Sequence, residues 1–149
     1  MQLIKNNSLQ LEHYHFTECV VVARDVEFDD IQVEGPYPSF SNLKLNSTVN
    51  IATPEEDENP NNFLLSLDVE CVPEESSSFP YVFKFRVEGI FECSFPENDT
   101  EERKRFVVSN GSTMLYGAVR EVLINLTSRQ KYGPVLLPTT SFANMQPAE

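Results

Sequence analysis

The segment that most constrains the fold is residues 81–95, YVFKFRVEGIFECSF, because apolar and charged side chains alternate along it. One parity carries Tyr81, Phe83, Phe85, Val87, Phe91, Cys93 and Phe95, and the other carries Lys84, Arg86, Glu88 and Glu92. Successive side chains of a β-strand point to opposite faces, so the pattern predicts a long strand with one buried and one solvated face. Gly89 inside it indicates a bulge or a bend.

Three other segments are also predicted to be strands. They span residues 16–28, 42–52 and 63–72 and show the same alternation. Loops that contain proline and charged residues separate the four segments. Four strands in succession, joined by loops of hairpin length, predict an antiparallel meander.

The first of these strands is predicted to have an acidic face. Asp25, Glu27 and Asp29 share one parity, and Val20 and Val22 share the other. The carboxylates would therefore point outward, into solvent.

The periodicity changes after the fourth strand and predicts a helix over about residues 112–130. Apolar residues recur there at spacings of three and four, at Leu115, Ala118, Val119, Val122, Leu123 and Leu126. Ser112 is a candidate N-cap, Gly133 and Pro134 end the helix, and residues 101–108 indicate a further short helix.

The predicted fold class is α+β, with a four-stranded antiparallel meander and a long C-terminal helix packed on one face. We expect one domain of 149 residues with its core at about 16–142, and flexible ends at 1–12 and 143–149.

Composition excludes several classes of function. A formal charge of −12 opposes binding to nucleic acid or to an anionic membrane. No apolar window is long enough for a membrane span or a signal core, so we expect a cytoplasmic protein without membrane insertion. Cys19, Cys71 and Cys93 are odd in number and widely spaced, which predicts reduced, buried thiols.

A catalytic site has no candidate in the sequence. GxGxxG, P-loop, HExxH and GxSxG motifs are absent, so we expect no enzyme activity, no cofactor and no metal. One alternative of another class stays open. His13, His15 and Cys19 share a parity on an extended segment and could supply three ligands of a metal-binding protein or an enzyme.

The C-terminal stretch YGPVLLPTTSF, residues 132–142, is apolar and carries two prolines without helical or strand periodicity. Pro134 and Pro138 keep it extended and leave backbone groups without partners in a regular element. Two interpretations stay open: a strap that covers the core, or one wall of a groove for an extended peptide.

The ordered pieces resemble the SecB family of bacterial export chaperones over roughly residues 16–142. The resemblance is carried by the four-strand sheet, by EGIF at 88–91, and by LYGAVREVLINLTSRQKYGPVLLPTTSF at 115–142. It implies an ATP-independent chaperone, or holdase, which binds unfolded polypeptides in protein export and assembles as a dimer of dimers, a homotetramer.

The resemblance also implies two sites. A client-binding groove would be lined by Phe91, Tyr132, Val135, Leu136, Leu137 and Phe142. RDVEFDD at 24–30 resembles the family's acidic surface for the ATPase SecA, with Asp25 and Asp29 at the matching positions and Glu27 beside them. Lys84 departs from this pattern, since the family has an acidic residue there. A SecB-like chaperone dedicated to one antitoxin of a toxin–antitoxin system is the alternative within this class.

Overall fold

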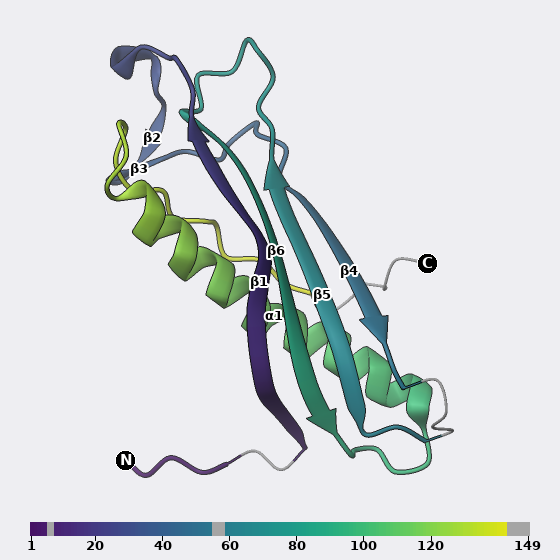
Figure 1. Ribbon diagram of the computed structural model, residues 1–149. Helices are drawn as coiled ribbons and strands as arrows, with labels where there is room; N and C mark the ends of the chain where they lie inside the picture. The colour runs from purple at the N-terminus through teal and green to yellow at the C-terminus, as the bar shows by residue number, and fades with distance from the viewer. Residues whose placement is uncertain (6–7, 55–58, 143–149) are drawn as a thin grey trace.

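The computed structural model describes residues 1–5, 8–54 and 59–142 and consists of one four-stranded sheet with a long helix on one face (Figure 1). The sheet contains β1 (Leu9–Ala23), β4 (Asn46–Ala52), β5 (Asn62–Cys71) and β6 (Tyr81–Cys93), and the helix is α1 (Thr100–Thr127). The short elements η1 (Phe28–Asp30), β2 (Val33–Glu34) and β3 (Tyr37–Pro38) lie between β1 and β4. The predicted α+β class is confirmed. The expected flexible end at 143–149 lies outside the described residues.

The strand order is β1-β6-β5-β4, with all neighbours antiparallel. β4, β5 and β6 form the predicted meander, but β1 pairs with β6 and not with the strand that follows it in sequence. The connection over residues 24–45 is longer than a hairpin loop and contains η1 and the β2–β3 hairpin. It therefore carries the chain across the end of the sheet to the opposite edge.

β1 lies earlier in the chain than predicted. It begins at Leu9, which is buried, and ends at Ala23, so residues 9–12 belong to the sheet and not to a flexible end. Arg24 ends the strand: its backbone N–H donates to Pro80 O (2.8 Å), and its guanidinium donates to Phe79 O (2.6 Å) and Ser77 O (2.9 Å).

The core lies between α1 and the inner face of the sheet. Alternate residues of β5 and β6 are buried, as the sequence predicts: Phe63, Leu65, Leu67, Val69, Cys71, Tyr81, Phe83, Phe85, Val87, Phe91 and Cys93. The helix contributes Val107, Val108, Leu115, Val119 and Leu123. Cys71 and Cys93 are thus buried thiols, as predicted, whereas Cys19 is exposed.

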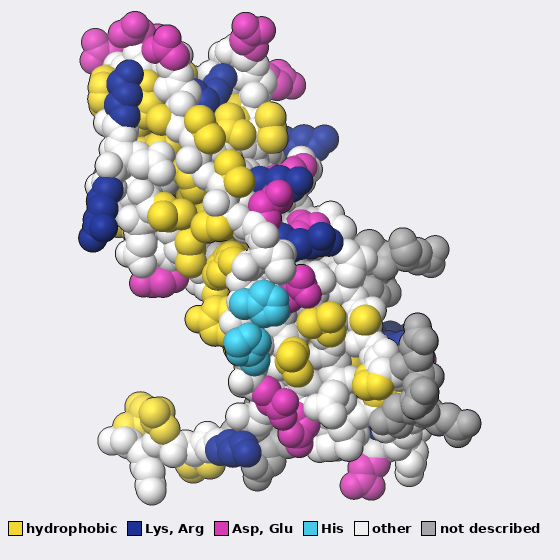
Figure 2. Space-filling view, in the orientation of Figure 1, with side chains coloured by type: hydrophobic (Ala, Val, Ile, Leu, Met, Phe, Trp, Pro, Cys, Tyr) yellow, Lys and Arg dark blue, Asp and Glu magenta, His cyan; other side chains and the backbone are white. Residues whose placement is uncertain are grey.

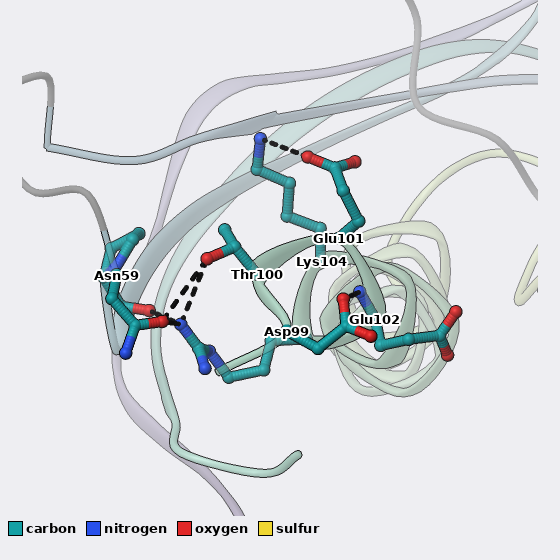
Figure 3. A network of polar contacts seen from close by, with 8 residues as sticks. Asn59, Asp99, Thr100, Glu101, Glu102 and Lys104 are labelled. Carbon is teal, nitrogen blue, oxygen red and sulfur yellow. Dashed lines mark hydrogen bonds and ion pairs between the residues drawn. The ribbon is translucent and has the colours of Figure 1, made fainter. Parts of the chain in front are cut away.

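α1 is one helix of 28 residues, where two shorter helices were predicted. It begins after Asp99, whose side chain accepts the backbone N–H of Glu102 (3.1 Å), as Figure 3 shows. The predicted N-cap at Ser112 is wrong, because Ser112 is buried in the middle of the helix. The small residues Gly111 and Ser112 lie where α1 is in close contact with the sheet. In the sequence they interrupt the apolar periodicity, which is why two shorter helices were predicted.

Arg103 holds the start of α1 against the sheet end. Its guanidinium is buried and donates to Pro96 O and Pro60 O (3.0 Å each) and to the side chain of Asn59. These contacts join the first turn of α1 to the chain before β5 and after β6. Glu101 and Lys104 add an exposed ion pair at 3.6 Å on the same turn (Figure 3).

Substitution of two helix glycines by alanine should change the free energy of unfolding in opposite directions. A Cβ at Gly111 would lie 2.8 Å from Leu65 Cδ2 and 3.0 Å from Phe91 Cζ, whereas a Cβ at Gly117 would meet no atom within 4 Å. We expect Gly117→Ala to raise the free energy of unfolding by about 0.5–1 kcal/mol, because alanine favours the helix. Gly111→Ala should lower it by about 1–2 kcal/mol through overpacking.

Urea denaturation of the two variants beside the wild type measures both changes. An equal stabilisation by both substitutions would contradict the close helix–sheet contact at Gly111.

Candidate functional site

The described chain ends in an extended segment, residues 134–142, which we call the strap. The chain turns at Gly133, whose positive φ of 78° suits glycine, and runs back beside α1 (yellow trace in Figure 1). Val135, Leu137 and Phe142 are buried in the same core as the sheet and the helix. The strap belongs to no helix or strand, so its apolar side chains enter the core without the support of a sheet ladder.

Three side chains donate hydrogen bonds to backbone carbonyls along this segment. The pairs are Tyr81 Oη to Gly133 O (2.7 Å), Arg120 Nε to Leu137 O (3.2 Å) and Tyr116 Oη to Pro138 O (2.6 Å). Burial raises the pKa of both tyrosine hydroxyls, so they remain protonated donors at neutral pH. We call Tyr81, Tyr116 and Arg120 the carbonyl donors.

Thr127 supplies a fourth contact to the strap. Its hydroxyl accepts the backbone N–H of Val135 (2.9 Å) and donates to Leu123 O (2.7 Å). Thr127 is fully buried, so this bond satisfies a strap amide that has no water available to it. The strap backbone is therefore held by side chains of α1, and Tyr81 of β6 holds the turn at Gly133 that precedes it.

The strap interpretation, one of two that the sequence left open, describes this structure. Phe91, Val135, Leu137 and Phe142 are buried, so they do not line an open groove, while Tyr132 and Leu136 are half-buried. The buried strap residues fill the space that a groove would leave.

Sequence reasoning missed the carbonyl donors. On α1, the side chains that bond to the strap are Tyr116, Arg120 and Thr127, which are spaced four and seven residues apart and so lie on one side of the helix. That spacing was a usable signal, because it continues the apolar stripe with groups that donate or accept hydrogen bonds.

Tyr132 connects the strap to the acidic segment after β1. Its hydroxyl donates to Val26 O (2.9 Å) and accepts from Val26 N (3.1 Å), and its ring lies 5.0 Å from that of Phe28. Asp25, Glu27 and Asp29 are exposed on this segment. They lie beyond the end of β1, so the prediction that they form one face of a strand is wrong.

The predicted metal ligands do not converge. His15 lies opposite Glu88, which points outward, whereas Cys19 lies opposite Phe85, which points into the core. Residues directly opposite each other share a face of the sheet, and a register shift between these two pairs moves Cys19 to the other face from His13 and His15. Among the described residues, no group of three or more His, Cys, Asp or Glu side chains could hold a metal ion.

The outer face of the sheet carries an apolar end and a charged middle. Val20 and Val22 are exposed on β1, and Val22 lies opposite the half-buried Val82. Figure 2 shows hydrophobic side chains gathered toward one end of this face, with charged side chains beside them. Lys84 then pairs with Glu18 at 3.4 Å and Arg86 with Asp68 at 3.0 Å. The basic Lys84, where the SecB resemblance implies an acidic residue, is thus partly neutralised by its neighbour.

Within residues 1–5, 8–54 and 59–142, no helix has the length and the apolar character needed to cross a membrane.

Comparison with known proteins gives a structural likeness and no sequence match. No family model and no curated protein matches the chain. The structure is similar to the Mycobacterium tuberculosis SecB-like chaperone Rv1957 in complex with a ChAD peptide from the antitoxin HigA1 (Rv1956), with a TM-score of 0.60 and 14% identity over 90% of this chain and 91% of that one. A Streptococcus agalactiae protein of unknown function matches with a TM-score of 0.48 and 14% identity over 88% and 97%. The chain therefore has a SecB-like fold.

The three cysteines differ in exposure, so their thiols should differ in reactivity. Cys19 is exposed, whereas Cys71 and Cys93 are buried, and burial raises the pKa of Cys71 to about 12. Since the thiolate is the reactive form, 5,5′-dithiobis(2-nitrobenzoic acid) should modify Cys19 in the folded protein and all three thiols in guanidinium chloride.

The absorbance of the released thionitrobenzoate counts the modified thiols, and Cys19→Ser is the matched control. Rapid labelling of the folded Cys19→Ser variant would contradict the burial of the other two thiols.

Proposed function

We propose that this protein is an ATP-independent chaperone of the SecB-like type, which holds extended segments of unfolded polypeptides and catalyses no reaction. The observation that carries the proposal is the strap site, where an extended apolar segment lies beside α1, is buried in the same core as the sheet and accepts hydrogen bonds from side chains at its carbonyls. Donors that bind backbone carbonyls do not select for side chains, so the same site suits many sequences.

The chemistry of the site favours holding over catalysis. Apolar burial has no directional requirement, so the core face that now receives Val135 and Leu137 tolerates different aliphatic and aromatic side chains. The formal charge of −12 attracts basic segments of unfolded chains and keeps bound clients from associating with one another. Neither effect needs a nucleotide, a metal or a cofactor.

The fold supports this proposal, since the similar mycobacterial protein is a chaperone whose structure contains a peptide from an antitoxin. We place the activity in the cytoplasm, with protein export as its first candidate context. The same comparison favours a second candidate, a chaperone dedicated to one antitoxin. The two differ in the number of clients: a general export chaperone binds many unfolded precursors, and a dedicated one binds a single partner.

We further propose a homo-oligomer, a dimer of dimers, with β1 as an interface between copies. β1 is a 15-residue edge strand that pairs with β6 on one side and, among the described residues, with no strand on the other. Tyr14, Val20 and Val22 are exposed on it. A long edge strand with exposed apolar residues is a template for pairing with another chain, and a second copy would cover it.

The acidic segment is the proposed contact for a basic partner protein such as SecA. Asp25, Glu27 and Asp29 are exposed beside the point where Tyr132 anchors the start of the strap. Because Tyr132 is hydrogen-bonded to this segment, a partner that moved the segment would also move the residue two positions before the strap.

Light scattering of diluted, denatured precursors tests the proposed function. With stoichiometric protein and no ATP, we expect aggregation of several unrelated precursors to be suppressed, and an inert acidic protein at equal concentration to have no effect. Sedimentation velocity of the same sample reports the assembly.

If the protein suppresses the aggregation of one antitoxin and of no other precursor, its function is that of a chaperone dedicated to that antitoxin. Unchanged scattering with every precursor and with antitoxins would contradict a chaperone function.

A further inference from the structure

We propose that the strap is an intramolecular substitute for a client: it occupies the polypeptide site in the free protein, and a bound client displaces it. This inference rests on the proposed chaperone function. The occupant that the site accepts is an extended apolar segment with few charges, and the strap gives the free protein a closed state that regulates access to this site.

The strap shows what the site recognises. Val135 and Leu137, two residues apart, are both buried, while Leu136 between them is half-buried. Within the strap, the carbonyls of Leu137 and Pro138 accept hydrogen bonds from Arg120 and Tyr116. Alternating apolar side chains and accepting carbonyls are present in any extended apolar segment, so an unfolded chain can reproduce each of these contacts.

The way in which the strap is held also allows its release from the core. It has no place in the sheet or in a helix, so its release breaks no ladder of backbone hydrogen bonds among the described elements. Pro134 and Pro138 lack the amide hydrogen that such a ladder would need. Thr139, Thr140 and Ser141 are exposed, and the next apolar contact is Phe142, whose ring lies 5.6 Å from that of Tyr116.

The geometry at the start of the strap supports its movement away from α1. Gly133 is a turn with positive φ, and a Cβ placed there would meet no atom within 4 Å, so space surrounds the hinge. Tyr132, just before it, stays tied to Val26 and Tyr81. Residues after the hinge can therefore move while α1 and the sheet keep their packing.

Displacement has a measurable consequence. A client binds only the fraction of molecules whose strap has left, and its apparent Kd equals the intrinsic Kd divided by that fraction. Substitutions that loosen the strap without removing a carbonyl donor should therefore tighten client binding. If strap side chains themselves contact the client, the same substitutions should weaken client binding.

Leu137→Ser and Phe142→Ala loosen the strap, because each removes a buried apolar group and leaves Tyr81, Tyr116 and Arg120 in place. The matched control is Val107→Ala, which removes a buried group from the N-terminal half of α1. The probe is fluorescein-labelled, reduced and carboxymethylated α-lactalbumin, which stays unfolded, and fluorescence anisotropy gives its Kd.

We expect both strap variants to bind the probe about tenfold more tightly than the wild type, with the control unchanged. A synthetic peptide of residues 133–142 should compete with the probe for the strap variants. Equal or weaker binding by both strap variants, with a wild type that binds, overturns the displaceable strap and leaves the chaperone function standing. Absence of binding by the wild type and by all variants overturns the proposed function itself.

Discussion

The fold depends on covering the inner face of β5 and β6. Their alternate residues form an apolar surface against which both α1 and the strap pack, and the burial of apolar surface is the dominant favourable term in folding. α1 can lie close to it where Gly111 faces Leu65 and Phe91. The strap covers what the helix leaves, so an irregular segment completes the core.

The two segments that cover this surface are held in different ways. α1 is capped by Asp99 and fixed by the buried Arg103, which bonds to carbonyls on both sides of the sheet end. The strap is held by side chains, chiefly the carbonyl donors and Thr127. In the proposed function, this apolar surface and its carbonyl donors are the site that an unfolded client would use.

Most of the sheet and half of the helix were predictable, because an element that buries one face has apolar residues that recur in the sequence with the period of that element. The strands at residues 62–71 and 81–93 match their predicted segments within two residues. β1 was misplaced since an edge strand is half-exposed and its two register shifts break the alternation. The strand order depends on the long 24–45 connection, which carries no periodic signal.

The candidate site was only partly predictable. The C-terminal stretch was identified from its prolines and apolar residues, but its burial depends on the space beside α1, which no local pattern reveals. The carbonyl donors are tyrosine and arginine residues whose partners lie up to 52 positions away. His13, His15 and Cys19 fail as a metal site for a related reason, because one register shift reverses the face on which a side chain lies.

Hydrogen–deuterium exchange of the amides in residues 135–142, with and without a saturating unfolded client, tests the central claim most directly. A displaced strap loses its contacts, so we expect faster exchange at Val135, whose amide donates to the Thr127 hydroxyl, while β5 and β6 remain protected. Slower or unchanged exchange of the strap in the complex would contradict displacement and would place the client on another surface of the molecule.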